Sequence, residues 1–340
     1  MTDGAFTYNG GRVDPGETAD IRDSISETYL GDPVRVPITI VNGPYDGPTV
    51  FLSAAVHGDE LNGIEVVREV AQDWPHDNLH GTLVCMPVVN VPGFIAQERY
   101  LPVYDRDLNR SFPGSDTSTS AKRMAHQLFT NFIEPCDYGV DFHTSTRGRS
   151  NMLHVRANMD DEDVAALARA FGSNVIIDST GPEGTLRREA SDAGAPTITV
   201  EMGEAHRFQR RFIDEALDGV ASVLAQYGLH PADPVDWPGW RTTIESGEKT
   251  WLRADAGGIV ETHYAHGDLV HEGDTVCTIT NPFKSTRDEV SAPFTGLLVG
   301  LLENPVVYPG NPLCHLVELD EPTRRAYERD RNGTMPERPA

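Results

Sequence analysis

The chain has 340 residues, 39% of them hydrophobic, and carries a formal net charge of -24 at pH 7. This length exceeds what one hydrophobic core usually supports, so we expect two domains. The negative charge argues against binding nucleic acid through a basic patch, and no apolar run reaches the length of about 18 residues that a membrane span needs.

The first clear elements are two strands joined by a turn. The runs VRVPITIV at 34–41 and TVFLSAAV at 49–56 are rich in β-branched residues, and NGPYDGP separates them. Residues 62–74 place their apolar positions roughly on one face of a helix, and TLVCMPVV at 82–89 predicts another strand. Residues 1–33 are polar and show no interpretable pattern.

Helices and strands continue to alternate through the middle of the chain. We predict helices at 119–133, 161–171 and 209–227, and strands at 138–142, 174–178 and 196–200. Alternation of apolar strands with helices is typical of an α/β sheet that helices cover on both faces.

The composition changes after the last of these helices. Residues 231–248 are rich in Pro and Gly, which predicts a linker, and short β-type runs separated by Gly turns follow it. We therefore expect an α/β domain over 1–235, a small all-β domain over 236–322 and a charged tail over 323–340.

The strongest local motif is Val56-His57-Gly58-Asp59-Glu60, at the end of a predicted strand. Ligands bind beyond the carboxyl ends of strands in open α/β sheets. His57 and Glu60 can face one metal ion if the chain between them turns tightly, which Gly58 permits. Most isolated H-x-x-E pairs are ordinary surface loops. Because catalytic zinc typically has three protein ligands and one water, a third ligand is required.

A candidate for that ligand, His143, lies in Asp141-Phe142-His143-Thr144 at the end of a second strand. The sheet would deliver it to the same edge as the first motif. Asp141 could orient a metal-bound histidine, as such ligands usually require. A core histidine bonded to a backbone carbonyl is the alternative, but two strand ends that each offer a ligand favour the metal site.

Two further motifs could act on a substrate. Asn109 and Arg110, within DLNRSFPG, could hold a carboxylate, with the arginine as a bidentate fork; an internal Asp–Arg ion pair is the alternative. Glu201 closes the strand ITV, where a carboxylate beside a metal could accept a proton from bound water. Glu204 competes for that role, although a solvated or capping glutamate explains it better.

Taken in order, HGDE, DLNRSFPG, DFHT and VEMGE resemble the motifs of the succinylglutamate desuccinylase/aspartoacylase family, a branch of the zinc carboxypeptidase superfamily. The resemblance covers roughly residues 35–230. It implies a zinc-carboxypeptidase-like mixed sheet with helices on both faces, together with the small C-terminal all-β domain. It also implies zinc-dependent hydrolysis of the amide bond of a small N-acylated amino acid.

The same resemblance implies a role for each motif residue. The metal ligands and the general base are, in order, His57, Glu60, His143 and Glu201, with one Zn2+ per chain. The pair that grips a substrate carboxylate is Asn109 and Arg110.

Two further arginines follow from the family pattern. Arg99 would polarise the substrate carbonyl, with Arg106 as its rival. The family also binds a second carboxylate or polar tail through an arginine before the Glu201 strand. We select Arg187 over Arg188 for that role, and a solvated basic pair is the alternative.

The C-terminal domain leaves alternative functions open. The run at 257–276 resembles the hammerhead of biotinyl and lipoyl carrier domains, and Lys284 lies where a carrier places its modified lysine. Because Asn-Pro-Phe-Lys lacks the carrier's Met-Lys-Met pattern, we prefer an unmodified cap that narrows the active-site entrance. The alternatives are a zinc carboxypeptidase acting on short peptides and a non-catalytic binding or carrier protein.

Charge and cysteine usage bear on the cellular setting. The only lysines are Lys122, Lys249 and Lys284, and an acidic surface with so few lysines suggests a halophilic protein, whose charge repulsion salt screens. An acidic protein of low-salt cells is the alternative. Four scattered cysteines, with no C-x-x-C pair and no visible secretory leader, favour the cytoplasm. The oligomeric state stays open, a homo-oligomer included.

Overall fold

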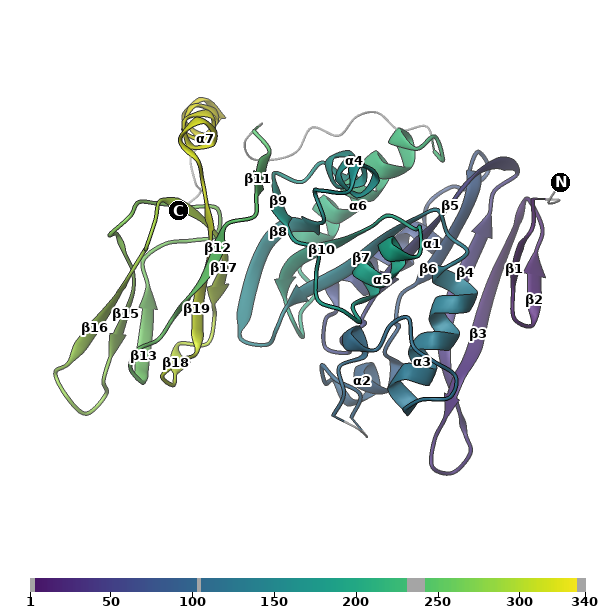
Figure 1. Ribbon diagram of the computed structural model, residues 1–340, viewed down its shortest axis with the longest axis horizontal. Coiled ribbons are helices and arrows are strands. Elements are labelled where there is room, and N and C mark those ends of the chain that lie inside the picture. The colour runs from purple at the N-terminus through teal and green to yellow at the C-terminus, as the bar shows by residue number, and fades with distance from the viewer. Residues whose placement is uncertain (1–3, 103–104, 231–241, 335–340) are drawn as a thin grey trace.

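The computed structural model describes residues 4–102, 105–230 and 242–334 (Figure 1). Its central feature is a thirteen-stranded mixed sheet whose main path runs β12-β19-β17-β8-β10-β7-β5-β6-β4-β3. Most of the predicted linker, and the predicted boundary between 235 and 236, lie outside the described residues. Among the described residues, no helix combines the length and the apolar character that crossing a bilayer requires.

The middle of this sheet consists of β4 (Pro33–Asn42), β5 (Tyr45–Ala54), β6 (His80–Met86), β7 (Tyr138–Ser145), β8 (Arg149–Ala157) and β10 (Thr197–Glu204). The strands β6, β5, β7 and β10 are parallel neighbours, and β8 runs antiparallel to β10. The carboxyl ends of β5, β7 and β10 therefore meet at one edge of the sheet.

Helices cover both faces of the sheet, which confirms the predicted α/β class (Figure 1). One face packs against α1 (Asn62–Gln72), α4 (Glu162–Phe171) and α6 (Arg210–Gln226). The other packs against α2 (Val91–Ala96), α3 (Ser120–Leu128) with the π-turn Phe129–Ile133, and α5 (Leu186–Asp192). Apart from the short α2, each of these helices buries apolar residues against the sheet.

Local chemistry fixes both ends of α4. The Asp161 side chain accepts hydrogen bonds from the backbone N–H groups of Asp163 and Val164, which caps α4 at its first turn. Gly172 ends the same helix with φ of 87°, a left-handed conformation that glycine adopts without a steric penalty.

The C-terminal region forms the predicted β-rich part. Its antiparallel sheet comprises β13 (Gly258–Thr262), β15 (Thr275–Thr280), β16 (Arg287–Ser291) and β18 (Val306–Val307). The strands β12 (Lys249–Arg253), β17 (Gly296–Leu302) and β19 (Pro312–Glu318) instead extend the main sheet, because β17 pairs with β8. The smaller strands β9 (Val175–Asp178), β11 (Ile244–Ser246) and β14 (Leu269–Val270) join the main sheet off its main path.

Several elements differ from the prediction. The unassigned N-terminal residues form β1 (Phe6–Tyr8), β2 (Gly11–Val13) and the long edge strand β3 (Glu17–Glu27), whose residues are mostly exposed or half-buried. Ala19, Ile21 and Ile25 contact the core at alternate positions, but Asp23 interrupts the series, so the alternation is weak in the sequence. Within the stretch read as a charged tail, α7 (Glu321–Thr334) forms instead, anchored by the buried Tyr327.

Candidate functional site

Three motif residues from two strand ends converge on one point. β5 and β7 are parallel neighbours with Ala54 opposite Phe142, so His143 and the loop that follows β5 begin at the same level. The Nδ1 atoms of His57 and His143 lie 3.1 Å apart. The two carboxylate oxygens of Glu60 lie 2.9 Å from the first Nδ1 and 2.8 Å from the second.

This donor set fits a zinc ion. His57, Glu60 and His143 are buried, at 3%, 2% and 4% exposure, and imidazole nitrogen with carboxylate oxygen is a common ligand combination of catalytic zinc. Among the described residues, no other group of three His, Cys, Asp or Glu side chains converges in this way.

The outward nitrogens of both imidazoles are held by carboxylates. His143 Nε2 lies 2.8 Å from Asp141 Oδ2, and His57 Nε2 lies 3.2 Å from Asp107 Oδ1. The Ser53 hydroxyl donates to the other oxygen of Asp141 at 2.8 Å. A proton held on each Nε2 leaves the Nδ1 lone pair facing the ligand group, which is the tautomer that metal binding needs.

The charges of the group stabilise one another. Burial alone would raise the pKa of Glu60, but the imidazoles of His57 and His143 lower it well below its usual range. Burial alone would lower the pKa of His143, but the carboxylates of Asp141 and Glu60 raise it well above its usual range. The cluster thus keeps Glu60 charged, and a metal ion would take the place of the proton that these carboxylates favour on His143 Nδ1.

Gly58 serves a purpose other than the one expected from the sequence. Its φ lies outside the left-handed region, so it does not supply a special turn. A Cβ placed on it would lie 2.0 Å from the backbone carbonyl carbon of Gly93. Because α2 approaches the loop that carries His57 and Glu60 this closely, there is no space for a side chain at position 58. The left-handed conformation occurs instead at Ala55, with φ of 50°.

Glu201 lies beside this group, on the same side of the sheet. In the parallel pair of β10 and β7, Glu201 is opposite His143 and Thr199 is opposite Asp141. Glu201 and the three ligand candidates line one cavity of about 300 Å3. The rival Glu204 does not line that cavity; its Oε2 accepts a hydrogen bond of 3.0 Å from Arg207.

The structure also separates the rival arginines. Arg99 lines the cavity and donates a hydrogen bond of 2.5 Å to Glu60, whereas Arg106 is exposed and outside it. Arg187 lines the cavity, is 7% exposed and donates from Nη1 to the Ser179 carbonyl at 2.6 Å. Arg188 does not line the cavity; it lies near Glu183 and Asp192.

Asn109 and Arg110 also line the cavity. Asn109 Oδ1 accepts from the backbone N–H of Leu186 at 2.8 Å, and its Nδ2 lies 3.4 Å from His143 Nε2. Arg110 donates to the Asn109 carbonyl at 2.6 Å, and its side chain is about half exposed. The asparagine thus ties its loop to the start of α5, and the arginine reaches toward the opening.

Among the further residues of the cavity that the sequence did not reveal are Arg149, Asn151, Arg156 and Trp251. Glu201 Oε2 accepts from Asn151 Nδ2 at 3.0 Å, and Arg156 Nε lies 3.2 Å from Oε1 as an ion pair without hydrogen-bond alignment. Five positions apart in one strand, these two side chains would ordinarily point to opposite faces.

An irregularity in β8 resolves this contradiction. Opposite β10, His154 pairs with Glu201 while Asn151 pairs with Gly203, so two residues of β8 oppose one of β10. One extra residue reverses the facing of the strand beyond it, which brings Asn151 and Arg156 to the same carboxylate. A bulge leaves no simple mark in the sequence, whereas the cluster of arginines at 147–156 was a visible signal.

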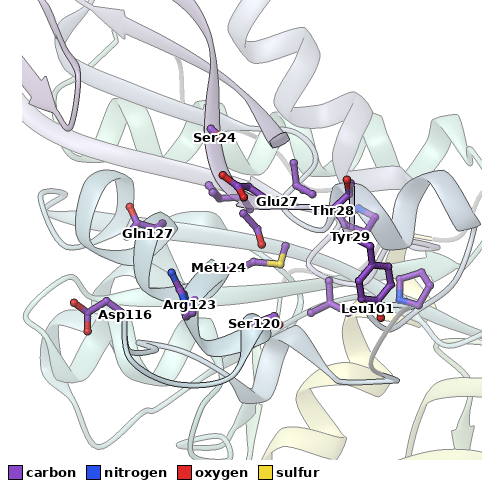
Figure 2. A pocket seen from close by; sticks show the side chains of 15 residues that line it. Ser24, Glu27, Thr28, Tyr29, Leu101, Asp116, Ser120, Arg123, Met124 and Gln127 are labelled. Carbon is purple, nitrogen blue, oxygen red and sulfur yellow. The ribbon is translucent and has the colours of Figure 1, made fainter. Parts of the chain in front are cut away.

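A second and larger cavity, of about 690 Å3, lies elsewhere, between β3 with its following turn and α3. Figure 2 shows Tyr29 and Leu101 at one end of it and Asp116, Arg123 and Gln127 at the other. None of the candidate ligands, bases or substrate-binding residues lines it. Lys284 is exposed, in the turn between β15 and β16. The chemistry therefore concentrates in the smaller cavity.

Comparison with known proteins finds a matching family model and similar relatives. The model of the succinylglutamate desuccinylase/aspartoacylase catalytic domain matches residues 46–227, just over half of the chain. The N-alpha-acetyl-L-2,4-diaminobutyric acid deacetylase of Halomonas elongata is 23% identical over 74% of this chain and 76% of its own. A succinylglutamate desuccinylase of Burkholderia orbicola is 34% identical over 60% and 64%, respectively.

A solved structure shares the fold. The product-bound ectoine utilization protein of Ruegeria pomeroyi superimposes with a TM-score of 0.81 at 20% identity, covering 94% of this chain and all of that one. Because the match spans nearly the whole chain, it includes the C-terminal β-rich region as well as the part that carries the site.

Proposed function

Because the chain belongs to the succinylglutamate desuccinylase/aspartoacylase family, we propose that it is a zinc-dependent hydrolase of the amide bond of an N-acylated amino acid. The observation that carries the proposal is the convergence of His57, Glu60 and His143 in the cavity that Glu201 also lines. The names of its relatives, a deacetylase and a desuccinylase, support a small acylated amino acid as substrate.

The metal ligands in this proposal are His57, Glu60 and His143. When bound, zinc supplies a Lewis acid that polarises a carbonyl and acidifies water. Glu201 accepts the proton of the attacking water and delivers it to the departing amine. Its clamp between Asn151 and Arg156 supports this role, because a base held in one orientation does not need to be ordered during the reaction.

Binding and charge stabilisation fall to the other polar residues of the cavity. Arg99 stabilises the negative charge that develops on the carbonyl oxygen, and Arg106 is too far outside the cavity to do so. Asn109 and Arg110 bind one substrate carboxylate. Arg187 binds a second carboxylate or a polar tail. Its burial supports this role, because no carboxylate of the described residues forms an ion pair with it.

A hydrolysis screen tests this function. Zinc-loaded protein is incubated with N-acetyl and N-succinyl amino acids and with short peptides, and released amine is quantified by chromatography. We expect release from the acylated amino acids, loss of release after chelation, and recovery when zinc returns. Hydrolysis of the peptides alone would instead identify a carboxypeptidase, and hydrolysis that survives chelation would overturn the metal assignment.

We further propose that the protein works in the cytoplasm of a high-salt cell. Its four cysteines are free thiols, and its net charge of -24 needs screening. The melting temperature should therefore fall when salt is lowered from molar concentration to dilute buffer. Melting that is independent of salt would contradict the halophilic part of the proposal.

A further inference from the structure

Two of the four cysteines meet inside the C-terminal region. The thiols of the chain are divided among three core clusters, with Cys85 in one and Cys136 in a second. Cys277 and Cys314 share the third, and their Sγ atoms lie 3.3 Å apart although 37 positions separate them in the chain. Cys136 instead donates from Sγ to the Phe132 carbonyl at 3.2 Å. Contact between two thiols therefore distinguishes one pair from the other cysteines.

The two thiols of this pair belong to different sheets. Cys277 lies in β15, within the four-stranded antiparallel sheet, and Cys314 lies in β19, within the main sheet. Both are fully buried. The apolar side chains of the cluster around them include Val260, Val276, Ile279, Leu298, Leu313 and Leu316. A covalent bond at this point would tie the small sheet to the sheet that carries the metal ligands.

The geometry and the acidity of the pair both favour such a bond. A disulfide holds its sulfur atoms about 2.05 Å apart, so these two must approach by about 1.3 Å, which small rotations about the Cα–Cβ bonds supply. The hydrogen bond with Cys314 lowers the pKa of Cys277 below its usual range. The same contact, followed by burial, raises the pKa of Cys314. Cys277 therefore loses its proton first, and the thiolate is the form that reacts with an oxidant.

The edge of the small sheet gives the pair a route to solvent. β16 is an edge strand whose residues are exposed or half-buried, and its Val290 is opposite Cys277. The ladder is irregular at this point, because Thr275 is opposite Ser291, so two positions on β15 correspond to one on β16. Local opening of a short, irregular edge strand needs less free energy than global unfolding. A molecule as small as hydrogen peroxide thus has access to the sulfur atoms.

We propose that Cys277 and Cys314 are an oxidisable pair, at which hydrogen peroxide forms a disulfide between the two sheets. Peroxide oxidises the Cys277 thiolate to a sulfenic acid and releases hydroxide, which takes up the proton that the thiol had lost. The Cys314 thiol then attacks the oxidised sulfur, its proton goes to the departing hydroxide, and water leaves. The two thiols lose two electrons, which the peroxide gains as it becomes two water molecules. This inference does not depend on the proposed deacylase function.

The bond would stabilise the part of the C-terminal region that reaches the cavity. Cys314 precedes His315, whose ring stacks on Trp251 with centres 4.6 Å apart and planes inclined by 4°. Trp251 lines the cavity beside the metal ligands. A disulfide also restricts the unfolded chain, because it closes the loop between positions 277 and 314. A reducing cytoplasm keeps the pair as thiols, so the bond forms when peroxide is present.

Peptide mapping of the wild-type protein tests the proposal. The folded protein is titrated with hydrogen peroxide, the remaining thiols are alkylated, and the digest is analysed by mass spectrometry without reduction. We expect a cross-link between Cys277 and Cys314 at peroxide concentrations that leave Cys85 and Cys136 open to alkylation after unfolding. The Tm should rise by about 5–10 °C, and dithiothreitol should reverse both changes. Free thiols or sulfinic acids at 277 and 314, or a cross-link to another cysteine, would overturn the proposal.

Variants assign the change in Tm to this bond. Cys277→Ala and Cys314→Ala should each lose the cross-link and the rise in Tm with peroxide. Cys136→Ala, which also removes a buried thiol, is the matched control and should keep both. Wild-type protein oxidised in urea should lose the preference for one pair, because the preference comes from the fold. A rise in Tm that persists in Cys277→Ala would show that peroxide acts elsewhere. The mapping of the wild type decides the proposal even where a variant does not fold.

Discussion

The two sides of the cavity balance their charges in different ways. On the metal side, both ring nitrogens of His57 and of His143 lie next to a carboxylate oxygen. The charges of these side chains therefore balance one another. On the arginine side, no carboxylate of the described residues forms an ion pair with Arg149 or Arg187. A self-compensated cluster is built to hold a cation, whereas uncompensated guanidiniums are built for an anionic ligand. In the proposed function, this difference separates the residues that perform the chemistry from those that bind the substrate.

Glu201 stands where the two sides meet, and its removal should have the largest effect. Glu201→Gln preserves the shape and the hydrogen bond from Asn151 but cannot accept a proton. We expect turnover to fall by about 100- to 10,000-fold, the usual contribution of a general base, with zinc content unchanged. Steady-state kinetics and metal analysis measure the two quantities. Glu204→Gln, outside the cavity, should retain activity; near-normal turnover in Glu201→Gln would contradict the base assignment.

The metal side depends on carboxylates behind the ligands. Asp141→Asn removes the charge that holds His143 Nε2 at 2.8 Å, and zinc affinity should fall about 10- to 100-fold. Competition with a chromogenic chelator measures this change. Asp137→Asn, just before the start of the same strand, should leave zinc affinity unaltered. Equal affinities for all three proteins would show that the tautomer of His143 needs no support.

Close packing under the metal loop can be tested without touching a polar group. Gly58→Ala places a methyl group 2.0 Å from the Gly93 carbonyl carbon, so the loop or α2 must shift. We expect a loss of about 1–3 kcal/mol in the free energy of unfolding and weaker zinc binding. Gly247→Ala, where the nearest atom is 3.6 Å away, is the control. A fully stable Gly58→Ala protein would mean that the approach of α2 is not rigid.

The cations on the arginine side should reduce the stability of the fold at low pH. Burial, and then the cations Arg156, Lys249 and Arg149, lower the pKa of His315 to about 3. An unfolded histidine titrates near 6.5, so between about pH 6.5 and 3 the unfolded chain binds a proton at this residue and the folded chain does not. The free energy of unfolding therefore falls as the pH falls through this range.

Replacing this imidazole should therefore blunt acid unfolding. In a circular dichroism titration, with each protein referred to its own folded state at pH 8, the midpoint of acid unfolding should lie at lower pH in His315→Gln than in the wild type. His271→Gln, at an exposed position, should leave the midpoint where it is in the wild type. An unchanged midpoint in His315→Gln would indicate that the imidazole is solvated in the fold.

Much of the fold and of the metal side could be predicted from the sequence because the signals are local. Strands β4 and β5 contain β-branched runs beside turn residues, His57 and Glu60 lie in the loop after β5, and His143 lies near the end of β7. By contrast, β3 and β8 lack a clean apolar alternation, and α5 is too short to show a helical period. Those elements are stabilised by their neighbours rather than by their own patterns.

The sequence by itself determined the α/β class, the order of the motifs and the residue types that could hold a cation, because these depend on neighbours within a few positions. Only the tertiary structure decided that Glu201 lies opposite His143, that a bulge in β8 brings Asn151 and Arg156 to it, and that Trp251 reaches the cavity from β12. Strand register and pairing between distant segments are set by packing across the whole sheet, and no local window of the chain contains that information.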